Sequence, residues 1–181
     1  MSNYRVAVRY ANSLIGLAIE TKKLEKVRSD MEMLDQLCRE LKPFHNFLKN
    51  PIINNYKKWE ILRKIFKSKI DELTYKFLEI LTRKNRENIL PEIVEQFLID
   101  YRAYKKIERV NVITPVILDE GLKKEFISLA GKIVGADKTI ELIEKKDEGI
   151  VGGYILRIGD KQIDDSISAK LRELRKKLIV S

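Results

Sequence analysis

The sequence is short of the residues on which most enzyme sites depend. Its 181 residues contain one cysteine, Cys38, and one histidine, His45. A single cysteine excludes an intramolecular disulfide, and its place in an apolar helical pattern indicates a small buried side chain in a reducing compartment rather than a catalytic thiol. Hydrolytic triads and metal sites usually draw on histidine, and His45 stands in a short segment bounded by prolines, which favours a surface or capping role. We expect no bound metal and no cofactor.

Long apolar runs and phosphate-binding motifs are also missing. No window approaches the roughly 18 consecutive apolar residues of a membrane span, and no secretory signal precedes the first helix, so we expect a cytoplasmic chain. There is no Walker-type G-x-x-x-x-G-K-[ST] stretch, and Gly152 and Gly153 stand inside a strand-like run. Asp160, Asp164 and Asp165 would be needed for an acid/base or cation site, but a turn and a helix start explain them more simply. The sequence therefore favours a protein that is not an enzyme.

The composition is basic and has enough apolar residues for a core. The formal net charge is +9 and 44% of the residues are hydrophobic, which suits a globular protein with acidic partners. Residues 57–69 are strongly basic and interleaved with aromatic residues, as a nucleic-acid-binding module would be. However, Trp59, Leu62 and Phe66 recur at helical spacing, which favours a core stripe beneath a solvated basic face. Nucleic-acid binding stays open as the alternative function.

Hydrophobic periodicity is helical up to about residue 106. In the second helix one stripe contains Leu24, Val27, Met31, Leu34, Cys38 and Leu41, and Pro43 follows it. The first helix, about residues 4–20, has an apolar arc wider than one core face needs. Further helices are expected at about 44–50, 54–67, 73–84 and 91–106, with Pro91 in the first turn of the last. Residues 1–106 are therefore predicted to form an all-α bundle of five or six helices.

After residue 106 the pattern changes to alternation with glycines. Val110, Val112, Thr114 and Val116 alternate, a helix is expected at about 120–134, and Ile140 and Leu142 alternate again. Runs at 149–158 and 161–163 flank a Gly159–Asp160 turn, which indicates a hairpin. Ser166 is a suitable N-cap for a last helix whose apolar stripe comprises Ile167, Leu171, Leu174 and Leu178. Residues 107–181 are predicted to form a small α+β domain.

The stretch from Gly149 to Leu174 resembles the C-terminal signature of the ATP synthase delta/oligomycin-sensitivity-conferring protein family. The signature has a glycine pair, an apolar strand, a Gly-Asp turn, an Ile-Asp-x-Ser step and a helix that opens with a basic residue and leucines. Arg9–Tyr10–Ala11 with Leu14 is similar to the family's first helix, and residues 85–97 are similar to its fifth and sixth. Two departures stand out: Asp165 replaces a frequent glycine, and the Asn85–Arg86 pair lacks the glycine often found between them.

The resemblance implies a non-catalytic stator component of a bacterial F1Fo ATP synthase. In that family the N-terminal bundle, here residues 1–106, binds N-terminal helices of alpha subunits in the F1 head. The C-terminal domain, here residues 107–181, binds the b subunits of the peripheral stalk. The chain would link the head to Fo, resist rotational torque, and be a peripheral component at the cytoplasmic face of the inner membrane. No nucleic acid and no small-molecule substrate is expected.

Two sets of contact residues are expected for these partners. An amphipathic partner helix needs an apolar groove, and the wide arc of the first helix offers one wall. The residues expected to bind the alpha-subunit helix are Tyr10, which follows from the family motif, and Leu14, Leu17, Leu78 and Thr82, which follow from spacing. The b subunits are expected to contact the final helix and the hairpin before it. The residues expected there are Ile167, Lys170, Leu171 and Leu174.

Overall fold

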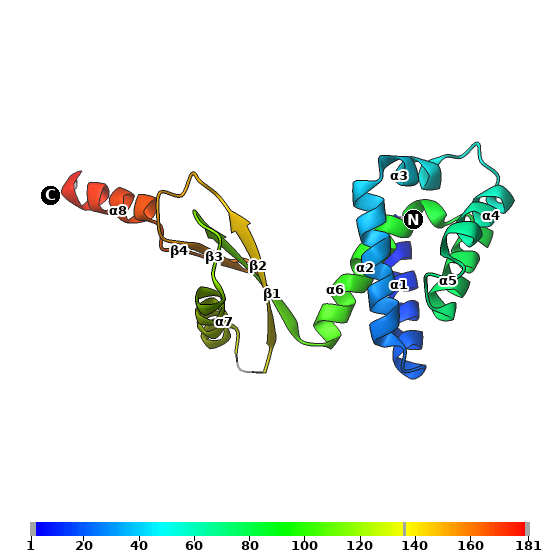
Figure 1. The fold of residues 1–181 in the computed structure, drawn as a ribbon, viewed down its shortest axis with the longest axis horizontal. Coiled ribbons are helices and arrows are strands. Elements are labelled where there is room, and N and C mark those ends of the chain that lie inside the picture. Colours follow the sequence, from blue (N-terminus) through cyan, green and yellow to red (C-terminus); the bar gives the residue numbers. More distant parts are fainter. Residues whose placement is uncertain (1–2, 136, 180–181) are drawn as a thin grey trace. The chain divides into compact units, whose positions relative to one another are not determined.

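The computed structural model describes residues 3–135 and 137–179 and divides into two compact units. The first unit extends to Tyr101 and the second begins at Arg102. The first is a helical bundle, and the second is a mixed α+β region with a four-stranded sheet, as the sequence predicts (Figure 1). Within the described residues, no helix is both long enough and apolar enough to cross a membrane.

Six α-helices build the first unit. They are α1 (Asn3–Glu20), α2 (Leu24–Glu40), α3 (Lys42–Lys49), α4 (Asn55–Phe66), α5 (Glu72–Arg83) and α6 (Leu90–Tyr104), with a short 3₁₀ turn, η1 (Glu87–Ile89), before α6. Local chemistry sets their starts. The side chains of Asn54 and Asp71 accept hydrogen bonds from the first-turn backbone N–H groups of α4 and α5. Pro43 and Pro91 occupy first turns, where a missing N–H costs nothing.

The core of the bundle follows the predicted stripe of α2 with one exception. Leu24, Val27, Met31, Leu34 and Cys38 are buried. The sixth member, Leu41, is 48% exposed, because α2 ends at Glu40 and Leu41 lies outside the last turn. On α1 the side chains of Ala7, Ala11 and Ala18 are fully buried, so this helix packs into the bundle through small residues.

A buried ion pair connects three elements of the bundle. Lys58 of α4 donates to the Oε1 atom of Glu87 in η1 at 2.6 Å and to the backbone oxygen of Leu48 in α3 at 3.0 Å. Lys58 is 3% exposed and Glu87 is 6% exposed. The basic residue 58 is thus part of the core, whereas the sequence pattern places it on a solvated face. A buried charge needs such partners because leaving it unpaired is costly.

The second unit contains β1 (Ile107–Thr114), α7 (Glu120–Val134), β2 (Thr139–Lys146), β3 (Ile155–Ile158), β4 (Lys161–Asp164) and α8 (Ile167–Ile179). The strand order is β2-β1-β3-β4, with β1 and β2 parallel and the other pairs antiparallel. α7 crosses from β1 to β2 and packs on one face of the sheet. Its Phe126 and Ala130 join Val110, Val112, Leu156 and Ile158 in the core.

Strand boundaries differ from the predicted ones in three places. β1 ends at Thr114, and Val116 is 60% exposed in the connection to α7. β2 is longer than the Ile140–Leu142 alternation because it pairs with β1 along its whole length. The strand after the glycine pair begins only at Ile155. The hairpin turn at Gly159 is confirmed, with φ of +54°.

Candidate functional site

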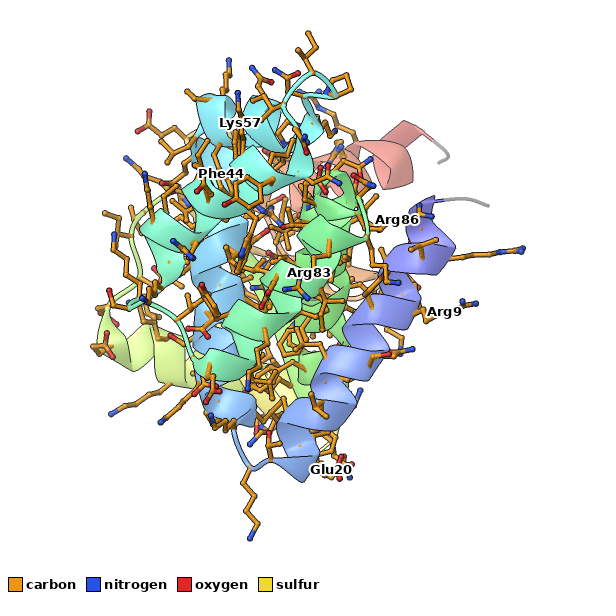
Figure 2. All side chains as sticks on the ribbon, turned by 90° about the vertical axis from the view of Figure 1, so that its right-hand side faces the viewer. Arg9, Glu20, Phe44, Lys57, Arg83 and Arg86 are labelled. Atoms are coloured by element: carbon orange, nitrogen blue, oxygen red, sulfur yellow. The ribbon has the colours of Figure 1, made fainter. Side chains whose placement is uncertain are left out.

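An apolar groove lies between α1 and α5. It is a hollow of about 270 Å³ lined by Tyr10, Ser13, Leu14, Leu17, Leu73, Lys76, Phe77 and Ile80. Figure 2 faces this side of the helical unit, with Arg9 and Glu20 marking α1 and Arg83 marking the end of α5. A second hollow, lined by Leu17, Thr21, Lys23, Glu72, Leu73 and Lys76, shares three of these residues and extends the groove toward the start of α5.

Each wall of the groove exposes a large apolar side chain. Leu17 is 49% exposed and Ile80 is 51% exposed, one on each wall. The rings of Tyr10 and Phe77 meet edge to face with their centroids 6.2 Å apart, so they connect the two walls. A concave, apolar strip of this kind matches the apolar face of an amphipathic helix.

The structure places the five residues predicted for this surface in two groups. Tyr10, Leu14 and Leu17 line the groove, although Leu14 is only 2% exposed and so lies at its base. Leu78 and Thr82 do not contribute to the lining: they are 2% and 1% exposed, and the hydroxyl of Thr82 donates to the backbone oxygen of Leu78. Both lie on the side of α5 that faces the core, and whether they contact a partner stays a prediction.

The α5 wall is made by Leu73, Phe77 and Ile80, with Lys76 between them. The sequence contains the signal, since these three residues recur at steps of four and three and define one helical stripe. Leu78 and Thr82 form a neighbouring stripe with the same period. Periodicity shows that two stripes exist, but it does not show which one a neighbouring helix covers.

Three apolar side chains of α8 in the second unit are about half exposed. Ile167, Leu171 and Leu174 are 45%, 54% and 55% exposed and share one face of the helix at steps of four and three. Lys170 is exposed beside them and pairs with Asp165 at 2.8 Å. The side chain of Leu178 lies outside the described residues. All four predicted stalk-binding residues thus lie at the surface, and whether they contact a partner stays a prediction.

The glycine-rich motif fixes the start of α8. The backbone oxygen of Gly152 accepts from the N–H of Ile167 at 3.0 Å, and the oxygen of Tyr154 accepts from Asp165 at 3.0 Å. Gly153 has φ of +81°, and a Cβ there would collide with the backbone of Asp165 and Ser166. Ser166 is buried and its Oγ caps α8 by accepting from Ala169 at 3.2 Å. The motif therefore fixes the position of the first turn of α8.

Asp164 and Asp165, which follow this motif, have structural partners. An Oδ of Asp164 accepts from the backbone N–H of Ser166 at 3.1 Å, and hydrogen bonds from Ser166 lower the pKa of that carboxyl. Asp160 lies in the hairpin turn. Within residues 3–135 and 137–179, no group of three or more His, Cys, Asp or Glu side chains is arranged to hold a metal ion.

The basic α4 does not present its aromatic residues as a stacking platform. Leu62 and Phe66 are buried, and the ring of Trp59 packs against Tyr75 with centroids 5.0 Å apart. Base stacking requires exposed ring faces, and in this segment only Tyr56 is largely exposed, at 69%. The geometry therefore gives no support to the nucleic-acid alternative.

Comparison with known proteins gives a match over nearly the whole chain. Residues 6–178 match the family model described as ATP synthase delta (OSCP) subunit. ATP synthase subunit delta of Cytophaga hutchinsonii is 38% identical over 179 residues, covering 98% of this chain and 96% of that one. The corresponding subunits of Amoebophilus asiaticus and Lactobacillus gasseri are 37% and 34% identical, each covering 99% of this chain and 97% of the relative.

A solved structure has the same fold. A chain in the cryo-EM structure of the Toxoplasma gondii mitochondrial ATP synthase hexamer superposes with a TM-score of 0.70 at 24% identity, covering 96% of this chain and 97% of the other. This likeness shows the fold, whereas the family match and the full-length bacterial relatives show the family. The chain belongs to the ATP synthase delta (OSCP) subunit family, and it is a non-catalytic stator component of an F-type ATP synthase.

Proposed function

We propose that this chain connects the catalytic F1 head to the b subunits of the peripheral stalk and resists the torque of rotation. In this proposal the groove between α1 and α5 binds the N-terminal helix of an alpha subunit, and α8 with the preceding hairpin binds the b subunits. The chain is then held at the cytoplasmic face of the membrane through the complex. Each predicted domain contributes one surface, residues 1–106 for the head and 107–181 for the stalk.

The observation that carries the proposal is the apolar groove with two half-exposed walls. Fully burying an exposed leucine or isoleucine side chain contributes about 1.5–3 kcal/mol, so covering the exposed halves of Leu17 and Ile80 offers roughly half of that for each side chain to an amphipathic helix. The second surface has the same character, because three apolar side chains on α8 are about half exposed. Apolar surface that is covered only in the complex favours binding that lasts, which a stator requires.

The head-binding surface is tested with Leu17→Asp and Ile80→Asp in the full chain. Both side chains are half exposed, so the variants are expected to fold, whereas Leu14→Asp would bury a charge in the core. Calorimetric titration with a synthetic peptide, which has the N-terminal sequence of the same organism's alpha subunit, should show at least a tenfold loss of affinity, about 1.4 kcal/mol. Ile61→Asp on α4, at a similarly exposed position, is the matched control and should bind normally.

The stalk-binding surface is tested with the double variant Leu171→Asp, Leu174→Asp. It should lose binding to a purified fragment that contains the C-terminal residues of the b protein, while the alpha-subunit peptide still binds. Ile127→Asp on α7, 40% exposed, is the control within the same unit. Unchanged b binding by the double variant would remove α8 from the interface, and loss of binding by Ile127→Asp would move the interface to α7.

A further inference from the structure

A group of polar side chains meets where α5 begins. Asp30 of α2 is 8% exposed, and its Oδ2 atom accepts two hydrogen bonds from the start of α5. The backbone N–H of Asp71 donates at 2.9 Å, and the hydroxyl of Thr74 donates at 2.6 Å. Thr74 is fully buried. One carboxylate of α2 therefore contacts both the N-cap and the first turn of α5.

Asp71 extends this group to the turn between α1 and α2. Its Oδ1 atom accepts from the backbone N–H of Leu73 at 2.9 Å and from Nζ of Lys23 at 2.9 Å. These bonds lower the pKa of Asp71, with the Leu73 N–H as the largest cause. Negative charge at a helix N-terminus is also favoured by the helix dipole. The start of α5 is thus bonded to two segments of the bundle.

The same first turn begins the wall of the groove. Leu73 adjoins Thr74 in sequence and lines the groove, and Phe77 and Ile80 continue the wall along α5. Lys23 lines the extension of the groove next to Leu17. Any shift or rotation of the first turn of α5 would move these apolar side chains relative to α1.

We propose that Asp30 and Thr74 are positioning residues for the groove, which set the position and rotation of α5 on α2 and, because α1 also contacts α2, relative to α1. This inference rests on the proposed function of the groove. Apolar contacts are non-directional, so they tolerate sliding and rotation of a helix. A buried hydroxyl–carboxylate bond is short, directional and strengthened by its low-dielectric surroundings. The pair keeps the groove preorganised, which lowers the cost of binding a partner helix.

The test compares Thr74→Val, which removes the hydroxyl but keeps the shape, with Thr74→Ser, which keeps the hydroxyl. Thr82→Val is a matched control, because Thr82 is equally buried on α5 but its hydroxyl donates within its own helix. Affinity is measured in the full chain by titration with the same synthetic alpha-subunit peptide. We expect Thr74→Val to weaken binding about fivefold, and Thr74→Ser and Thr82→Val to bind like the wild type.

A second readout does not depend on the partner. The ring of Tyr10 lies edge to face against Phe77, so its NMR resonances report the spacing of the two walls in the free chain. These resonances should move in Thr74→Val and return in Thr74→Ser. If Thr74→Val does not fold, Asp30→Asn, which keeps the acceptor oxygen but removes its charge, should change affinity and resonances in the same direction.

Failure of this inference and failure of the proposed function are distinguishable. If the wild type binds the peptide and Thr74→Val shows unchanged affinity and unchanged Tyr10 resonances, the positioning role is overturned. If the wild type does not bind the peptide, the proposed function of the groove fails, and with it the link from Asp30 to binding. Movement of the Tyr10 resonances in Thr74→Val would then show only that the bond sets the spacing of α1 and α5.

Discussion

In the helical unit a hollow lined mostly by apolar side chains lies between two helices, whereas in the α+β unit three half-exposed apolar side chains follow one face of a single helix, α8. The first surface therefore depends on how α1 and α5 are placed, and the buried carboxylate of Asp30 in α2 accepts a hydrogen bond from Thr74 in the first turn of α5. The second depends on how one helix is attached, and a local motif around Gly153 does this. The two units thus present apolar surface in two ways. The groove requires contacts between residues far apart in sequence, which place two helices relative to each other. The stripe requires only that the N-terminus of one helix is held in place.

The largest loss of stability is expected when the buried ion pair of the helical unit is broken. Lys58→Met leaves the carboxylate of Glu87 buried without its cation, which should destabilise that unit by about 3–5 kcal/mol. Replacing both partners, as Lys58→Met with Glu87→Leu, should recover most of this loss. Urea unfolding followed by the fluorescence of Trp59 measures it, because the single tryptophan lies in α4.

This experiment also tests whether the two units are energetically separate. Binding of the b-subunit fragment should persist in Lys58→Met at urea concentrations where Trp59 already reports unfolding of the bundle. Simultaneous loss of both signals would show that the two units unfold together. They would then differ in the form of their exposed apolar surfaces but would not be energetically independent.

A smaller loss of stability is expected when the glycine motif at the start of α8 is altered. In Gly153→Ala the new Cβ meets the backbone of Asp165 and Ser166 at a φ of +81°, which should cost about 1–3 kcal/mol. Because Gly153 lies against the start of α8, we expect faster amide hydrogen exchange in α8 and weaker binding of the b-subunit fragment. The control is Gly131→Ala in α7, where the Cβ would make an ordinary 3.6 Å contact with Ile140.

How far the sequence predicts the molecule depends on the range of the interactions involved. Helix positions, the hairpin at Gly159 and the N-cap Ser166 follow from local patterns, so they are predictable. The groove is not, because the sequence shows two apolar stripes on α5 and the packing against α2 and α4 decides which one is covered. Spacing alone therefore misses Leu73, Phe77 and Ile80 as the wall. It points instead to Leu78 and Thr82, which are buried.

Charged residues also show that local sequence patterns do not reveal long-range contacts. The sequence places Lys58 among solvated lysines of α4, but the structure buries it because Glu87, 29 residues away, supplies a counter-charge. In the same way Asp30 has no local signal and gains its role from Thr74, 44 residues away. The family signature is the opposite case, since Gly152, Gly153 and Ser166 lie close together in sequence and also contact one another through the start of α8.

A still smaller loss of stability, which depends on pH, is expected when the N-cap of α5 is removed. Asp71→Ala should destabilise the helical unit by about 1 kcal/mol at neutral pH through loss of the N-cap. The pKa of Asp71 is lowered in the folded chain by the Leu73 N–H and by Lys23, with a smaller effect of Lys26. Its contribution is therefore fully present above the unfolded-state pKa of about 3.9 and is lost as the pH falls through the lower folded pKa.

The difference in unfolding free energy between wild type and Asp71→Ala should accordingly be constant from pH 7 to about pH 5 and shrink in stronger acid. Asp71→Asn separates the two causes, because asparagine also caps a helix but carries no charge. Its destabilisation should be smaller than that of Asp71→Ala. A difference between wild type and Asp71→Ala that grows in acid would show that the carboxylate is not stabilised in the folded chain.

The last prediction concerns the reactivity of Cys38 rather than a loss of stability, and it distinguishes the two units most directly. Burial, followed by Asp35 and Glu92, raises the pKa of its thiol from 9.0 to about 11, which lowers the thiolate fraction at pH 8 about a hundredfold. Native labelling by iodoacetamide should be slower than labelling in urea by at least this factor. Because Cys38 lies in α2, Lys58→Met should accelerate labelling by opening the bundle, whereas Gly153→Ala should leave the rate unchanged. Acceleration by Gly153→Ala would mean that a defect at α8 reaches the helical core, and the two surfaces would no longer be independent.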